Sequence, residues 1–111
     1  TAGRAGQLAT GRNPHGYQGR HTLGGEAFDV YFFPAGSPYT GLAWKFIVLE
    51  PVVFGGADGA QREWRPILDF LVSKGWVSRD DWLNSVEFGA EPAYAGSKGD
   101  VTVRGFKVEV Q

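Results

Sequence analysis

The stretch Asp81–Pro92, DWLNSVEFGAEP, decides the expected fold, because a strand pattern and two carboxylates coincide there. At the two-residue period of a strand, one face carries Glu87 and Glu91, and the other is mostly apolar. The apolar face consists of Trp82, Val86, Phe88 and Ala90, together with Asn84. The two glutamates are four positions apart, so their Cα atoms would lie about 13 Å apart along a strand, which excludes a close carboxylate pair. Pro92 offers no ladder N–H, which places Glu91 at a strand end or bulge.

The composition limits the class of protein around this stretch. The 111 residues carry a formal net charge of −1, which fits one domain and gives no electrostatic reason to expect nucleic acid or an anionic membrane as a partner. Seventeen glycines and an aromatic content of 14% favour short strands and tight turns, and hence a mainly β class. Lys45 and Glu50 interrupt the longest apolar run, so neither a membrane span nor a signal peptide is visible.

Metal and cofactor sites are not expected from the residue types. The chain has no cysteine, which excludes disulfides and thiolate metal sites. His15 and His21 have no acidic or cysteine neighbours at ligand spacing, so a surface or loop role is favoured for both. Ser97 lies in a GSKG run that matches neither a nucleophile elbow nor a phosphate loop, and a plain turn is favoured.

The remaining strands are expected on both sides of the central stretch. Residues 1–19 are rich in glycine and predict a flexible loop or tail. Further strands are predicted at Arg20–Leu23, Glu26–Phe33, Gly41–Glu50 and Val101–Val110, with Gly24-Gly25 as a two-residue hairpin turn between the first two. In the second strand, one face carries Phe28, Val30 and Phe32, and the other carries Asp29, Tyr31 and Phe33.

One helix is predicted, from about Trp64 to Lys74. Pro66 suits its first turn, and Gly75 suits the cap beyond its end. The apolar residues expected to bury one side are Ile67, Leu68, Leu71 and Val72. Core positions are favoured over a ligand platform for the four tryptophans, Trp44, Trp64, Trp76 and Trp82.

Two runs resemble the C-terminal end of glycoside hydrolase family 12, the β-1,4-glucanases and xyloglucanases. These runs are WLNSVEFGAEPAYAG (82–96) and VRGFKVEV (103–110). In that family a Gly-x-Glu-Pro run is followed by a Gly-rich turn and a closing strand. The run GEAFDVYF (25–32) is similar to another strand of the family, and the predicted helix is similar to its single helix. The resemblance covers residues 14–110, with the Glu91 motif as its most specific part.

The resemblance implies a fold and a chemistry. It implies an all-β, concanavalin-like β-jelly roll of two packed antiparallel sheets, of which residues 20–111 would be the C-terminal half of a single catalytic domain, with the helix at 64–74. It implies β-1,4-glucan as substrate, Glu91 as general acid/base, a secreted protein and no cofactor. Substrate-binding roles are expected for Tyr31, Phe33, Asp29 and Glu87.

One departure from the family pattern concerns the nucleophile. Members carry a second glutamate in an upstream run of the form Glu-x-Met-Ile-Trp, which these residues lack. A retaining glycosidase needs two carboxyl groups about 5–5.5 Å apart, and Glu91 supplies one of them. We therefore expect the nucleophile on a second polypeptide or segment carrying the N-terminal half, and expect the chain alone to be neither a stable monomer nor a catalyst. Two alternatives stay open: a non-catalytic, lectin-like carbohydrate-binding module, and a small structural α+β domain.

Overall fold

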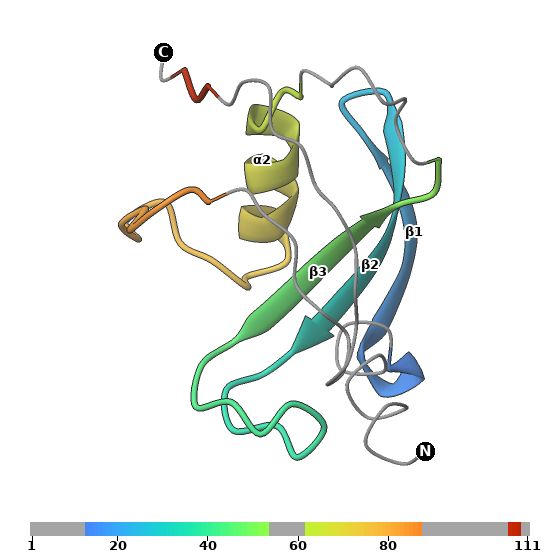
Figure 1. The fold of residues 1–111 in the computed structure, drawn as a ribbon, viewed down its shortest axis with the longest axis vertical. Helices are drawn as coiled ribbons and strands as arrows, with labels where there is room; N and C mark the ends of the chain where they lie inside the picture. The colour runs from blue at the N-terminus through green and yellow to red at the C-terminus, as the bar shows by residue number, and fades with distance from the viewer. Residues whose placement is uncertain (1–12, 54–61, 88–106, 110–111) are drawn as a thin grey trace, which may run out of the picture.

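The computed structural model describes residues 13–53, 62–87 and 107–109. In this part of the chain, a short 3-10 turn η1 (Pro14–Gly16) precedes three strands, β1 (Tyr17–Leu23), β2 (Glu26–Phe33) and β3 (Phe46–Pro51), and one helix, α2 (Arg65–Ser73). The strands form one antiparallel sheet in the order β1-β2-β3. The helix lies beside the sheet (Figure 1). The described part is therefore mostly sheet, as an all-β class requires.

The predicted hairpin between β1 and β2 is confirmed. Gly24 and Gly25 have φ values of 60° and 82°, the paired positive angles of a two-residue hairpin turn that glycine adopts without strain. The strand starts at Tyr17, not at Arg20 as predicted, because Tyr17 still pairs with Tyr31 across an irregularity in the register. The prediction of a loop over 1–19 is therefore wrong for the residues from Tyr17 onward, and residues 1–12 lie outside the described part.

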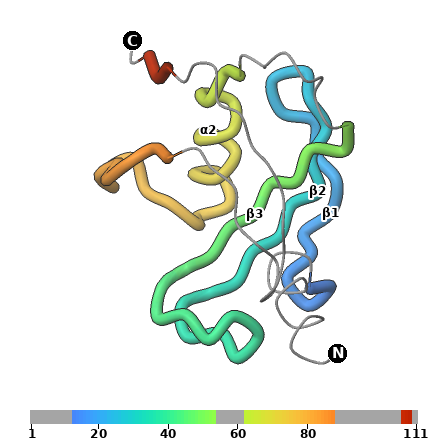
Figure 2. The backbone as a smooth tube through the Cα atoms, in the orientation of Figure 1, coloured from blue at the N-terminus to red at the C-terminus, as the bar shows by residue number. Residues whose placement is uncertain are grey.

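The third strand is shorter than predicted. It begins at Phe46, whereas the sequence pattern predicted a start at Gly41. Phe46 pairs with Phe33, the last residue of β2, so the residues before Phe46 have no partner strand there. They belong instead to a long connection, in which the Gly36 amide donates to the Leu42 carbonyl at 2.8 Å. Figure 2 shows this connection at one end of the sheet.

The helix confirms the predicted segment, with Trp64 and Lys74 as its flanking caps and a proline in its first turn. Its end is closed by two backbone bonds, from the Gly75 amide to the Val72 carbonyl at 2.9 Å and from the Trp76 amide to the Leu71 carbonyl at 3.1 Å. This is the Schellman pattern, which needs the left-handed φ of 73° at Gly75. The C-terminal cap predicted from the glycine is therefore present.

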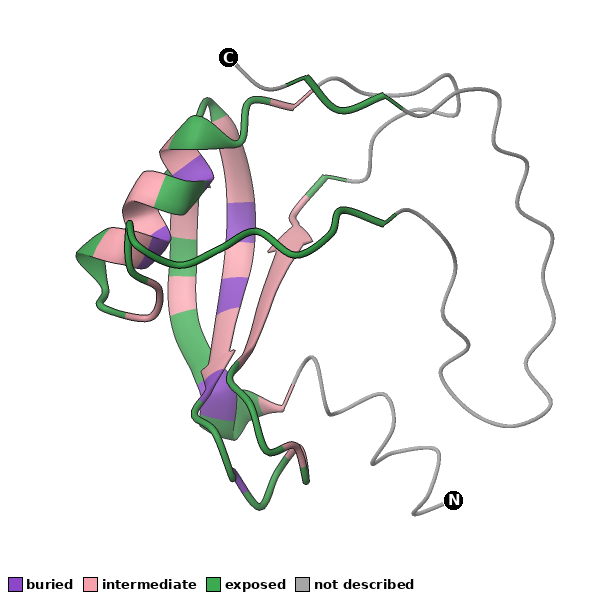
Figure 3. Cartoon of the chain, turned by 90° about the vertical axis from the view of Figure 1, so that its left-hand side faces the viewer, coloured by how far each residue is buried: buried purple, intermediate pink, exposed green. Residues whose placement is uncertain are grey.

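The core lies between the helix and one face of the sheet (Figure 3). Its buried residues are Phe28, Val30, Ile67 and Leu71, and half-buried apolar residues surround them: Leu23, Ile47, Leu49, Phe70, Trp76 and Val77. The predicted alternation along β2 is thus confirmed for Phe28 and Val30. Leu68 was expected on the buried side, but it is 51% exposed, and Phe70 packs against the core instead.

The central strand predicted at Asp81–Pro92 is wrong for residues 81–87, which are exposed and not in a strand. Trp82 is 96% exposed and Leu83 is 74% exposed. The Asp81 carboxylate accepts a bond from the Ser78 amide at 2.7 Å, and the Asp81 amide donates to the Ser78 carbonyl at 3.0 Å. These bonds close a turn over residues 78–81. Residues 88–92, with Glu91, lie outside the described part.

Two further expectations are corrected. Residues 107–109 are described and are not in a strand, while the rest of the strand predicted at Val101–Val110 lies outside the described part. Core positions were favoured for all four tryptophans, but Trp44, Trp64 and Trp82 are 63%, 53% and 96% exposed. Trp76 alone among them is half-buried. No helix in the described ranges has the length and apolar character needed to span a bilayer.

Candidate functional site

The sheet face opposite α2 carries the predicted binding residues of β2. The register places the side chains of facing pairs on the same side of the sheet, so this face can be followed across all three strands. We call it the open face, because α2 lies on the other side of the sheet and, among the described elements, only η1 packs on this one, at its Phe33 end. Its residues are Tyr17, Arg20 and Thr22 from β1, Ala27, Asp29, Tyr31 and Phe33 from β2, and Phe46, Val48 and Glu50 from β3.

Asp29 is the polar centre of the open face. Its Oδ1 accepts a hydrogen bond from Arg20 Nε and its Oδ2 accepts one from Arg20 Nη2, both at 3.1 Å. The Tyr17 hydroxyl donates to the same Oδ1 at 3.0 Å. The Arg20 guanidinium, helped by the Tyr17 hydroxyl, lowers the pKa of Asp29 below its ordinary value. Asp29 is therefore a fixed, ionised acceptor at neutral pH.

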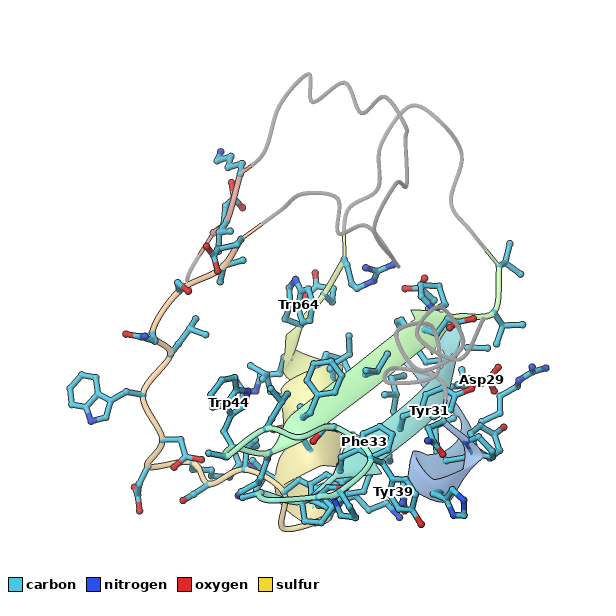
Figure 4. The ribbon with its side chains drawn as sticks, turned by 60° about the horizontal axis from the view of Figure 1, so that its bottom comes forward. Asp29, Tyr31, Phe33, Tyr39, Trp44 and Trp64 are labelled. Carbon is cyan, nitrogen blue, oxygen red and sulfur yellow. The ribbon has the colours of Figure 1, made fainter. Side chains whose placement is uncertain are left out.

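The same arrangement keeps the Tyr17 hydroxyl protonated. Its hydrogen bond to the Asp29 carboxylate raises the pKa of Tyr17, because ionising the phenol would place two negative charges side by side. The ring of Tyr17 is 45% exposed and lies 5.3 Å from the ring of Tyr31, tilted by 53°. Two aromatic rings thus adjoin a carboxylate and a guanidinium on a single face. Asp29 and Tyr31 lie across the strands from Trp44 (Figure 4).

The strand register places Phe33 on the open face, but its ring is not exposed there for a sugar to stack on. Its side chain is 1% exposed. The ring packs so closely on Gly16 that a Cβ at that glycine would lie 2.3 Å from Cζ of Phe33, and it also adjoins Phe46 with the ring centroids 6.3 Å apart. Phe33 therefore closes the end of the sheet against η1, and its burial does not support the substrate-binding role expected of it.

The structure describes one of the two predicted glutamates. Glu87 is exposed in the irregular segment after α2, and Glu91 lies outside the described part. Three residues of the open face were not predicted from the sequence: Tyr17, Arg20 and Glu50. Glu50 directly opposes Asp29 across β2 and β3. Their signal was the hairpin register: once Gly24-Gly25 is accepted as a two-residue turn, Arg20 must face Asp29.

The two histidines have packing partners within the described ranges. His15 stacks on Tyr39 with ring centroids 4.3 Å apart. His21 lies 4.7 Å from the Phe70 ring, and its Nε2 is 3.0 Å from the Gln18 carbonyl oxygen. Among the residues described, no group of three or more His, Cys, Asp or Glu side chains could hold a metal ion. Searches of protein-family models, curated proteins and solved structures found no match to this chain.

Proposed function

We propose that this chain is the Glu91-bearing part of a secreted β-1,4-glucan hydrolase with a jelly-roll fold. The sequence resemblance around Glu91 and the open face of the sheet support the proposal. The open face is the observation that carries it, because it offers the two kinds of contact that a pyranose ring needs. Its aromatic rings can cover the C–H face of a sugar, and its charged groups can bind hydroxyls.

The expected division of roles on the open face follows from the contacts. Tyr31 lies on β2, the middle strand of the described sheet, beside the ring of Tyr17, where a glucose unit can stack. Asp29 is held by Arg20 and Tyr17, so it can accept a sugar hydroxyl without reorienting. A preorganised acceptor of this kind costs little entropy when a ligand binds. The open face is therefore proposed to bind and orient glucose units.

The chemistry is proposed to be the retaining route. Glu91 donates a proton to the leaving glycosidic oxygen while a second carboxylate attacks the anomeric carbon, and Glu91 then removes a proton from the water that releases the sugar. The second carboxylate is proposed to come from a segment outside these 111 residues. The described sheet leaves room for this, since β1 and β3 each pair with one described strand and each offers a second edge to further strands.

The test is hydrolysis by the completed enzyme, meaning this chain with the segment that carries the nucleophile. Reducing-sugar release from β-1,4-glucan should fall by about 10²–10⁴-fold in Glu91→Gln, because Gln cannot donate the proton. Glu63→Gln is the matched control, at an exposed glutamate to which no catalytic or binding role is assigned, and should stay near the wild-type rate. With an aryl β-cellobioside whose leaving group is an acidic phenol, the Glu91→Gln variant should lose much less of the rate of its first step, the formation of the glycosyl-enzyme. The reason is that such a phenol leaves without being protonated.

Three outcomes would overturn the proposal or part of it. Full activity of Glu91→Gln on unactivated glucan would remove Glu91 from the acid/base role. Glucan cleavage by the 111-residue chain alone would place the nucleophile within it, and Asp29 and Glu50, which face each other across two strands, would be the first pair to substitute. Glucan binding without turnover in the completed protein would favour the runner-up, a carbohydrate-binding module, which the rings of the open face also support.

A further inference from the structure

A groove of about 720 Å³ lies on the other face of the sheet from Tyr31 and Asp29. Its lining residues come from the connection before β3 and from β3 itself, and from the segments that follow α2: Trp44, Lys45, Ile47, Trp76, Val77, Asp81, Trp82 and Asn84. Ile47 pairs with Phe32, and both belong to the side of the sheet that α2 covers. The groove is therefore separate from the open face, and its size falls within the range of ligand sites.

The floor of the groove is rigidly held. The Trp76 indole stacks on the Phe32 ring with centroids 4.6 Å apart and planes 9° apart, and it meets the Phe70 ring edge-on at 6.0 Å. Lys45 Nζ donates to the Trp76 carbonyl at 2.7 Å. This bond ties the segment that carries Trp44 to the segment after the helix. The aromatic wall of the groove is thus built before any ligand arrives.

The two outer tryptophans contribute little to packing. Trp44 is 63% exposed and Trp82 is 96% exposed. Trp82 directly follows the hydrogen-bonded turn between Ser78 and Asp81, and its indole is in solvent. Exposed indoles flanking a shared groove are typical of a surface that binds a ligand.

The charges that line the groove decide between ligand classes. Lys45 and Asp81 supply one charge of each sign, and both are already engaged, by the Trp76 carbonyl and the Ser78 amide respectively. The balance favours neither an anionic nor a cationic ligand, while the amide of Asn84 and the indole N–H groups can bond hydroxyls. We propose that this groove is a second binding site, for a neutral oligosaccharide whose pyranose rings stack on Trp44 and Trp82.

This inference rests on the groove alone and does not require the chain to be a hydrolase. The test uses the full chain, with any companion polypeptide that purifies with it, carrying Tyr31→Ala to weaken the open face. Intrinsic tryptophan fluorescence is titrated with cellopentaose and, separately, with maltopentaose. Trp44→Ala and Trp82→Ala should each weaken the binding of cellopentaose, of maltopentaose or of both by about ten-fold. Trp44→Tyr should retain most of the affinity, because it keeps a ring.

The matched control is Trp64→Ala, which removes an indole of similar exposure, 53%, that does not line the groove. Its affinity should equal that of the Tyr31→Ala parent. Unchanged affinity in Trp44→Ala and Trp82→Ala would overturn the proposal, as would the absence of binding to both oligosaccharides. If Trp44→Ala and Trp82→Ala changed the oligomeric state measured by sedimentation but not the saccharide affinity, the proposal would also be overturned, and the groove would be identified as a protein interface. Each of these results can be read whether or not Glu91→Gln affects hydrolysis.

Discussion

Tyr17 and Asp29 are joined across β1 and β2 by a 3.0 Å hydrogen bond from the phenol to the carboxylate. The two residues are 12 apart in sequence and come together because the hairpin turn fixes the register of the strands. Arg20 holds the same carboxylate through two further bonds. The open face therefore has an ordered carboxylate beside its rings.

The first prediction concerns pH. The pKa of Asp29 is depressed, chiefly by the Arg20 guanidinium, so its contribution to stability is complete above the ordinary value of 3.8 and is lost as the pH falls through the lower folded value. Thermal unfolding between about pH 6 and pH 2 should therefore show a shallower acid-side loss of stability in Asp29→Asn than in the wild type. Asp80→Asn, in the exposed turn after α2, is the control and should follow the wild-type curve. Superimposable curves for Asp29→Asn and the wild type would refute the role of this pair.

The second prediction concerns the contact between Gly16 and Phe33. A methyl group at position 16 would overlap three atoms of the buried Phe33 ring, at 2.3, 2.5 and 2.8 Å. Gly16→Ala should lower the free energy of unfolding by about 1–3 kcal/mol in urea denaturation. Combining it with Phe33→Leu should cost less than the sum of the two single substitutions, because the smaller side chain makes room. Strict additivity would show that the two residues do not compete for space.

The third prediction tests the buried side of α2. Ile67 is 2% exposed in the core, whereas its neighbour Leu68 is 51% exposed. Ile67→Ala should cost about 2–5 kcal/mol of unfolding free energy, the usual range for truncating a buried aliphatic side chain. Leu68→Ala should stay within about 0.5 kcal/mol, as exposed positions do. A larger loss for Leu68→Ala would mean that a partner covers this side of the helix in solution.

The fourth prediction tests the helix cap. Gly75 has a φ of 73°, and an added Cβ there would meet no atom within 4 Å, so only backbone strain opposes a substitution. Gly75→Ala should cost about 1 kcal/mol in thermal or urea unfolding, and Gly75→Asn should cost less, because asparagine adopts the left-handed region more readily. Equal losses for the two variants would argue against a strained cap.

Local signals predicted the hairpin and the helix well, and the reason is chemical. Paired glycines at 24 and 25 and the Pro66…Gly75 spacing each specify a backbone conformation on their own. The alternation along β2 likewise indicated Phe28 and Val30 as core, since one side of that strand packs on the helix. These are features that a short stretch of chain determines without reference to distant residues.

The errors arose where tertiary partners decide the outcome. The apolar alternation of residues 82–86 is typical of a strand, but a strand also needs a neighbour, and these residues have none among the described strands. The strand predicted from Gly41 does not include residues 41–45 for the same reason, because β2 ends at Phe33 and offers them no partner. The candidate site was half predicted: Asp29 and Tyr31 came from the β2 pattern, whereas Tyr17 and Arg20 could be found only through the register.

The open face is tested most directly by titrating the isotopically labelled chain, together with any companion polypeptide that purifies with it, with cellohexaose and following the backbone amide NMR signals of the labelled chain. We expect the largest shifts at four residues of the open face, Tyr17, Arg20, Asp29 and Tyr31, at concentrations that leave the signals of α2 unaffected. We also expect that Tyr31→Ala weakens this binding without a matching loss of thermal stability, whereas Tyr39→Ala, at an exposed ring outside the open face, leaves it unchanged. Absence of shifts on the open face at saturating cellohexaose, or a Tyr31→Ala variant that loses stability and keeps its affinity, would contradict the account.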